Sequence, residues 1–166
     1  GGGFLFDTGA HMLNTIADLA GERFTDVWAI FNNDDGPVEV FAVMMGRLES
    51  GALVTINGCG DTAPSCASDI RVFCTKAALR TGMWGESLGI LRKQPDEWWL
   101  TGPSRDQTWE QIDVPPSKGV WDRFLAVRDG SIANPSPPEL GLRMAQLWDA
   151  IKESAVHDGS PVRIQE

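Results

Sequence analysis

The sequence has no tyrosine, only two histidines and three cysteines, and no long uninterrupted apolar stretch. Without about 18 consecutive apolar residues it offers no ordinary membrane-spanning helix, and its first residues lack the cationic-then-apolar order of a secretory signal peptide. The cysteines, Cys59, Cys66 and Cys74, are an odd number at spacings that match neither a CxxC redox motif nor a zinc-ligand pair. We therefore expect no metal site and a reducing, cytoplasmic compartment.

Basic residues are also in short supply. The chain has 14 Lys+Arg against 23 Asp+Glu, a formal net charge of -9 at pH 7. It contains no basic run that could follow a phosphate backbone. Nucleic acid and anionic membrane surfaces are therefore not expected as partners.

What the sequence does have is an ordinary soluble-domain composition, with 42% hydrophobic residues over a length of 166. A chain of this size builds a sizeable core without disulfide or metal staples, and one domain over residues 1–166 is the natural expectation. Three glycines open the chain and no initiator methionine precedes them. We expect the chain to be a piece of a longer protein.

Three stretches have the apolar spacing of helices. Apolar residues recur every three to four positions over 12–20, and Gly21 follows as a helix-ending glycine. A second helix is expected at about 119–129, and a third, with the clearest apolar stripe, at 137–156. Residues 136–139 (SPPE) form a capping-box pattern with proline at the first position of the third helix.

Apolar runs with strand character are separated by turn residues. These runs, which predict an antiparallel meander, are 27–31, 38–45, 52–56 and 70–74. The run 38–45 is apolar at both alternating sets of positions, so we expect both of its faces to be covered. Shorter strands are expected within 84–114 and at 162–164. The predicted fold is α+β, an open, mostly antiparallel β-sheet with helices packed on one face.

Asp7 and His11 are the residues best suited to chemistry. Their spacing of four puts both side chains on one face of a helix that starts near Thr8. A carboxylate beside an imidazole fixes the tautomer of the ring and favours its protonated form, which suits reversible proton transfer at neutral pH. The alternative is structural: Asp7 caps the helix, and His11 is a first-turn residue with a satisfied hydrogen bond.

Both ends of the chain resemble the C-terminal domain of the Gfo/Idh/MocA oxidoreductases. Residues 1–11 (GGGFLFDTGAH) resemble that family's DxGxH signature, in which a glycine run and an apolar strand end lead into the domain's first helix. Residues 142–154 (LRMAQLWDAIKES), followed by 159–162 (GSPV), resemble its closing helix and turn. Between them, residues 70–77 (IRVFCTKA) stand where the family has a strand followed by Gly-Thr-x-Gly.

The chain departs from the family pattern in two places. Cys74 and Ala77 replace the two glycines of the turn, and Asn14 stands where the family often has an aspartate three residues after the histidine. The family's second acid/base group, a lysine before a proline, belongs to its Rossmann domain. Neither Lys76 nor Lys93 is given that role here.

The resemblance implies an NAD(P)-dependent oxidoreductase that binds NAD or NADP on an N-terminal Rossmann domain absent from this chain. Residues 1–166 would then form the substrate-binding and oligomerisation domain. Hydride would pass between the nicotinamide and a sugar, inositol or related polyol. His11 would take or return the hydroxyl proton, and Asp7 would orient His11 or bind a neighbouring hydroxyl. The fragment alone is expected to bind no cofactor and to be inactive.

A second glycine motif points elsewhere. Residues 58–63 (GCGDTA) fit the GxGxxA pattern of a dinucleotide-binding turn. The helix that this turn requires is not expected, because Pro64 and Ser65 follow and no helical apolar period begins. We interpret the segment as a Gly-rich loop without cofactor.

Seven tryptophans raise the possibility of sugar stacking. Trp121 and Trp148 lie on helical apolar stripes and are expected in the core, while Trp28 is ambiguous. The remaining tryptophans fall in the loop-rich region, where partial burial is the more frequent fate: Trp84, Trp98, Trp99 and Trp109.

A rival hypothesis from another class remains: a non-catalytic sheet domain that dimerises or binds a small ligand. In either case we expect a homodimer or higher homo-oligomer formed through the sheet face. The two later helices suffice to cover one face, whereas Phe41 and Val43 lie on a strand that is apolar on both.

Overall fold

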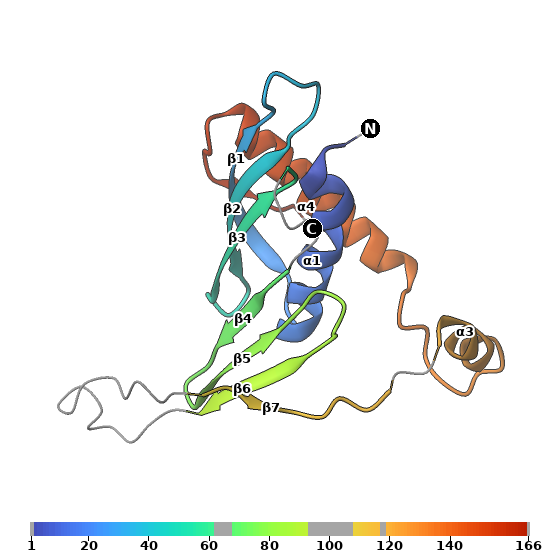
Figure 1. The fold of residues 1–166 in the computed structure, drawn as a ribbon. Coiled ribbons are helices and arrows are strands. Elements are labelled where there is room, and N and C mark those ends of the chain that lie inside the picture. The colour runs from blue at the N-terminus through green and yellow to red at the C-terminus, as the bar shows by residue number, and fades with distance from the viewer. Residues whose placement is uncertain (1, 62–67, 93–107, 117–118, 166) are drawn as a thin grey trace, which may run out of the picture. The chain divides into compact units, whose positions relative to one another are not determined.

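A computed structural model describes residues 2–61, 68–92, 108–116 and 119–165 of the chain (Figure 1). It divides into two compact units, the first formed by Gly1–Ser65 with Asn134–Glu166 and the second by Cys66–Ala133. Each unit has a sheet of its own.

The first unit is a four-stranded antiparallel sheet with two helices against one face. Its strands lie in the order β3-β2-β1-β8. Helix α4 packs on β1 and β8, α1 packs on β2 and β3, and the two helices touch each other (Figure 1). The elements are α1 (Phe4–Ala20), β1 (Phe24–Asn32), β2 (Phe41–Leu48), β3 (Leu53–Cys59), α4 (Pro138–Val156) and β8 (Val162–Arg163). The predicted α+β class, with an open antiparallel sheet, is confirmed.

Helix α1 is longer than its apolar period predicted. Its buried positions are four residues apart: Leu5, Gly9, Leu13 and Ala17. It ends where expected, because Gly21 adopts φ 67°, a left-handed conformation that glycine tolerates, and its N–H bonds to Ala17 O. It begins at Phe4 and not near Thr8, so Phe4 to Phe6 form its first turn and are not a strand end.

Helix α4 lies where the third helix was predicted, with Leu147 and Ile151 buried at its centre. The predicted capping box is wrong. The residue before the first turn is Pro137, which has no side-chain donor or acceptor, and Ser136 lies one position too early to reach the helix. The backbone N–H of Ser136 instead bonds to Asn134 Oδ1 at 3.0 Å.

Strand β2 alternates strictly between its two faces. Ala42 and Met44 are buried under the helices, whereas Val43 and Met45 on the other face are 52% and 50% exposed. The helices therefore cover one face of this strand, and cover for the other face stays a prediction. The strand also begins at Phe41 and not at residue 38, because the preceding residues turn to meet the start of α1.

The second unit carries the other antiparallel sheet, with its strands in the order β4-β5-β6-β7. The fourth strand of the predicted meander, β4, pairs with β5 and not with β3. A tight turn causes this, since Cys74 N–H bonds to Ala77 O at 2.9 Å and folds the chain directly back on itself. The elements are β4 (Ile70–Phe73), β5 (Ala77–Thr81), β6 (Leu88–Arg92), β7 (Glu110–Gln111) and α3 (Val120–Arg128).

Helix α3 confirms the predicted second helix but not its role. None of its residues is buried, so it covers no sheet face. Trp121, expected in the core, is 68% exposed and stacks on Phe124 with ring centroids 5.3 Å apart. Trp148 does pack inward, 5.0 Å from Phe6 and 6.1 Å from Phe31.

Some predicted features lie outside the described residues, namely Cys66, Trp98, Trp99 and the end of the GxGxxA segment. Cys59 and Cys74 are exposed free thiols. Within the described ranges no helix is long and apolar enough to span a bilayer.

Candidate functional site

Asp7 and His11 lie one turn apart on α1, on the side of the helix away from its buried positions. Both side chains are exposed. Helical spacing of four places their Cβ atoms about 5–6 Å apart, close enough for the carboxylate to orient the imidazole. The rival role of Asp7 as helix cap is excluded, because the capping position is Gly3 and Asp7 N–H makes an intrahelical bond to Gly3 O at 3.0 Å.

The start of α1 is held by Glu39, a residue that the sequence patterns did not single out. Glu39 is only 6% exposed, and its Oε1 accepts hydrogen bonds from Leu5 N at 3.0 Å and Phe6 N at 3.3 Å. Its backbone oxygen accepts a third bond, from Phe4 N at 3.0 Å. One acidic residue from the β1–β2 connection therefore satisfies three of the free N–H groups at the helix N-terminus.

Gly3 is required by this arrangement. A Cβ at that position would run into the carboxylate and backbone oxygen of Glu39. The glycine therefore lets the buried carboxylate approach the helix end, where the positive end of the helix dipole favours it. The only sequence signal for Glu39 was an acidic residue next to a strongly apolar run.

The polar stripe that begins with Asp7 and His11 continues along α1. Asn14 and Asp18 follow at helical spacing, with Asn14 Nδ2 donating to Asp18 Oδ2 at 3.0 Å. Arg143 of α4 donates from Nη2 to Asn14 Oδ1 at 2.9 Å and to Asp18 Oδ1 at 3.1 Å. Asn14, where an aspartate is usual in the resembled family, thus serves here as a link between the two helices.

An apolar groove of about 310 Å³ runs between α1 and α4 beside this stripe. Phe6 and Trp148 face each other in its wall, and Leu13 and Met144 extend it. Neither Asp7 nor His11 lines the groove. An apolar groove with exposed polar side chains near it suits an organic molecule that carries a hydroxyl group.

The remaining candidates do not join this site. Gly58 and Cys59 belong to β3 and pair with Ala42 and Phe41, so this part of the GxGxxA segment is strand and not a phosphate-binding turn. Trp28 lies on the outer face of the sheet, with the guanidinium carbon of Arg47 5.7 Å from its ring centroid. No group of three or more metal-ligating side chains occurs in the part of the chain that the structure describes.

Comparison with known proteins agrees with the resemblance predicted from the sequence. Residues 1–80 match the family described as the GFO/IDH/MocA C-terminal domain. Among curated proteins no match is found.

Many solved structures share the fold. An NAD binding oxidoreductase from Klebsiella pneumoniae is 18% identical over 100% of this chain and 51% of its own, with a TM-score of 0.75. The WlbA dehydrogenase from Bordetella pertussis, solved with NADH and UDP-GlcNAcA, is 20% identical over 99% of this chain and 46% of its own, with a TM-score of 0.71. UDP-N-acetylglucosamine 3-dehydrogenase GnnA from Acidithiobacillus ferrooxidans is 14% identical over 93% and 48%, with a TM-score of 0.74. The chain therefore spans about half the length of the structures it resembles.

Proposed function

We propose that this chain is part of an oxidoreductase, because it has the fold of the Gfo/Idh/MocA C-terminal domain and, over residues 1–80, matches its sequence pattern. The chain is the substrate domain of an NAD(P)-dependent enzyme that acts on a sugar, inositol or related polyol. The observation that carries the proposal is that Asp7 and His11 lie one turn apart on the exposed face of a helix whose start is fixed by Glu39. The similar structures described as dehydrogenases or as NAD binding support the reaction class.

In this proposal His11 handles the proton of the reaction. Oxidation of an alcohol removes a hydride from the carbon and a proton from the oxygen, and the nicotinamide accepts the hydride when it is bound. His11 takes the proton from the hydroxyl, and Asp7 orients the ring and offsets the positive charge it gains. In the reverse reaction His11 returns the proton to the carbonyl oxygen.

The described residues do not fit a cofactor site of their own. A pyrophosphate needs a glycine-rich turn that opens a helix, and residues 58 and 59 are instead paired within a sheet. We assign cofactor binding to a Rossmann domain outside this chain. The free thiols of Cys59 and Cys74 support a reducing, cytoplasmic setting.

The test is the substitution His11→Asn in the full-length enzyme. We expect oxidation of its best substrate, chosen from a panel of sugars, inositols and sugar nucleotides, to slow by roughly 10²–10⁴-fold, as for other lost acid/base groups. The matched control is His157→Asn, since His157 is the other histidine and lies at the far end of α4. Near-normal turnover of His11→Asn would show that His11 is structural.

The assignment of cofactor binding to another domain has its own test. Purified residues 1–166 should show no saturable binding when NADH or NADPH fluorescence is titrated against them, and no dehydrogenase activity. Micromolar binding by this fragment would contradict the assignment of the cofactor to another domain.

The rival reading, a non-catalytic module for self-association or small-ligand binding, is favoured by the apolar outer face of the first sheet. Ile30 and Val43 are paired across β1 and β2 on that face and are 60% and 52% exposed. The substitution His11→Asn distinguishes the two hypotheses. It should leave the self-association and ligand binding of a non-catalytic module unchanged, whereas it should slow turnover by an enzyme.

A further inference from the structure

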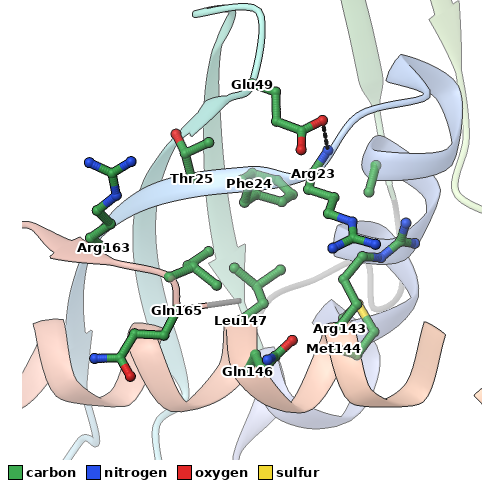
Figure 2. A pocket seen from close by; sticks show the side chains of 12 residues that line it. Arg23, Phe24, Thr25, Glu49, Arg143, Met144, Gln146, Leu147, Arg163 and Gln165 are labelled. Atoms are coloured by element: carbon green, nitrogen blue, oxygen red, sulfur yellow. Dashed lines mark hydrogen bonds between the residues drawn. The ribbon is translucent and has the colours of Figure 1, made fainter. Parts of the chain in front are cut away.

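A cavity of about 480 Å³ lies in the first unit, away from Asp7 and His11 (Figure 2). It is lined by the end of α1, the beginning of β1, the turn after β2, the middle of α4, and β8 with the residues that follow it. Its volume is within the usual range for small-molecule sites. Neither Asp7 nor His11 lines it.

The charge of this cavity is opposite to that of the chain. Arg23, Arg143 and Arg163 line it with a single carboxylate, Glu49, although the whole chain carries a net charge of -9. Figure 2 draws the side chains of Arg23 and Arg143 at one end of the cavity and that of Arg163 at the other. Like charges that line one cavity repel each other, and Asp18 pairs with Arg143 but not with Arg23.

Several side-chain N–H groups of these arginines form no hydrogen bond within the part of the chain that the structure describes. Among the described residues, the side chains of Arg23 and Arg163 have no hydrogen bond or ion pair. Arg143 uses Nη2 for Asn14 and Asp18, while its Nε is buried without any partner. A buried N–H left unpaired costs free energy that a bound acceptor would recover.

Of the nearby carboxylates, Asp18 is paired with Arg143, whereas Glu49 and Glu22 accept hydrogen bonds from backbone N–H groups. Glu49 Oε2 accepts from Arg23 N at 3.4 Å, and Glu22 Oε2 accepts from Ser50 N at 2.9 Å. The hydrogen bonds from the backbone N–H and then the hydroxyl of Ser50 hold the pKa of Glu22 below its ordinary value. Among the described residues, neither Glu22 nor Glu49 forms an ion pair with these guanidinium groups, and Asp18 pairs with Arg143 alone.

We propose that this cavity binds the oxyanion of a small organic molecule, a carboxylate or a phosphate, between Arg23 and Arg143. Planar guanidinium groups match both anions through paired N–H donors. The buried side chains of Phe24 and Leu147 in the wall suit the carbon skeleton of such a molecule. The site is independent of the oxidoreductase proposal, because it uses none of the same residues.

Titration of the 166-residue chain with inorganic phosphate and, separately, with malonate tests the site at constant ionic strength. Arginine Nε–H resonances in NMR spectra report occupancy. Arg23→Gln and Arg143→Lys should each raise the Kd at least about tenfold, the effect of one charge-assisted hydrogen bond. Arg143→Lys keeps a cation beside Asp18, and Arg23 has no side-chain partner to lose, so both variants should remain folded.

Arg123→Gln is the matched control for Arg23→Gln, since Arg123 is an exposed residue of α3 that does not line the cavity and its loss changes the net charge equally. It should alter the Kd less than about twofold, because solvent and salt screen an exposed charge that does not line the cavity. Saturation by phosphate alone identifies a phosphorylated ligand, and saturation by malonate alone a carboxylate. No saturable binding, or equal weakening by Arg123→Gln, overturns the proposal.

Discussion

Ser154 is a buried hydroxyl in the last turn of α4 that joins three parts of the first unit. It is 0% exposed; its Oγ accepts from Ala29 N at 2.8 Å and donates to Ser160 O at 2.6 Å. Ser154→Ala should lower the free energy of unfolding by roughly 1–3 kcal/mol, because both backbone groups lose their partner. Urea unfolding followed by tryptophan fluorescence measures the change.

Ser160→Ala is the control for that prediction. Ser160 is exposed, and its hydroxyl bonds only to the nearby His157 O at 2.8 Å. We expect a change within about 0.5 kcal/mol, as at ordinary surface positions. Equal losses in the two variants would mean that the buried network of Ser154 contributes nothing specific.

Residues whose role depends on local spacing were predictable, and those whose role depends on distant contacts were not. The shared face of Asp7 and His11 follows from helical geometry alone. Glu39 acts on residues more than 30 positions away, and Arg143 bonds to Asn14 across 129 positions. No periodic pattern in the sequence records such contacts.

At the scale of elements, the first turn of α1 depends on Glu39. Removing its carboxylate in Glu39→Ala leaves the N–H groups of Leu5 and Phe6 unpaired. We expect a loss of about 1–2 kcal/mol in unfolding free energy, as for other helix caps. Glu39→Gln should lose less, because its amide oxygen still accepts.

Amide hydrogen exchange locates this effect. In Glu39→Ala the amides of Leu5 and Phe6 should lose protection, while that of Leu13 in the middle of the helix should not. Glu139→Ala is the matched control, since Glu139 is acidic, lies in the first turn of α4 and makes no side-chain cap. Unchanged exchange at Leu5 in Glu39→Ala would rule out the capping role.

Elements with a strong apolar period were predicted well, and weakly patterned ones were not. The apolar stripe of α4 and the glycine that follows the helix, Gly159, predicted this helix correctly. Strand β5 reads AALRT, two alanines followed by mixed residues, and its strand state depends on pairing with both β4 and β6. For α3 the period was right, but whether its apolar side is buried depends on neighbours that the period does not specify.

At the scale of the whole molecule, the apolar runs of the sequence predict a single sheet. The strands instead form two four-stranded sheets, and α1 and α4 cover the first. The first sheet ends at β3, and its inner face packs against α1 and α4. Its outer face has no cover among the described residues of the same unit.

That outer face is expected to mediate self-association. Its exposed apolar residues are Ile30, Val43, Met45 and Leu53, and the pairing of Ile30 with Val43 and of Trp28 with Met45 makes part of the patch continuous. A contiguous apolar patch of this kind usually marks an interface, and two-fold pairing of identical chains is its commonest form.

Light scattering at micromolar concentration should therefore report a dimer or larger assembly of the 166-residue chain. Val43→Glu should shift it to monomer, because a buried unpaired carboxylate at the centre of an apolar interface is strongly unfavourable. Leu142→Glu makes the same change at a 62% exposed position on α4 and should leave the assembly intact. If the chain is already monomeric and Val43→Glu leaves its solubility unchanged, the sheet face is not an interface; if Leu142→Glu dissociates the assembly instead, the helices form it.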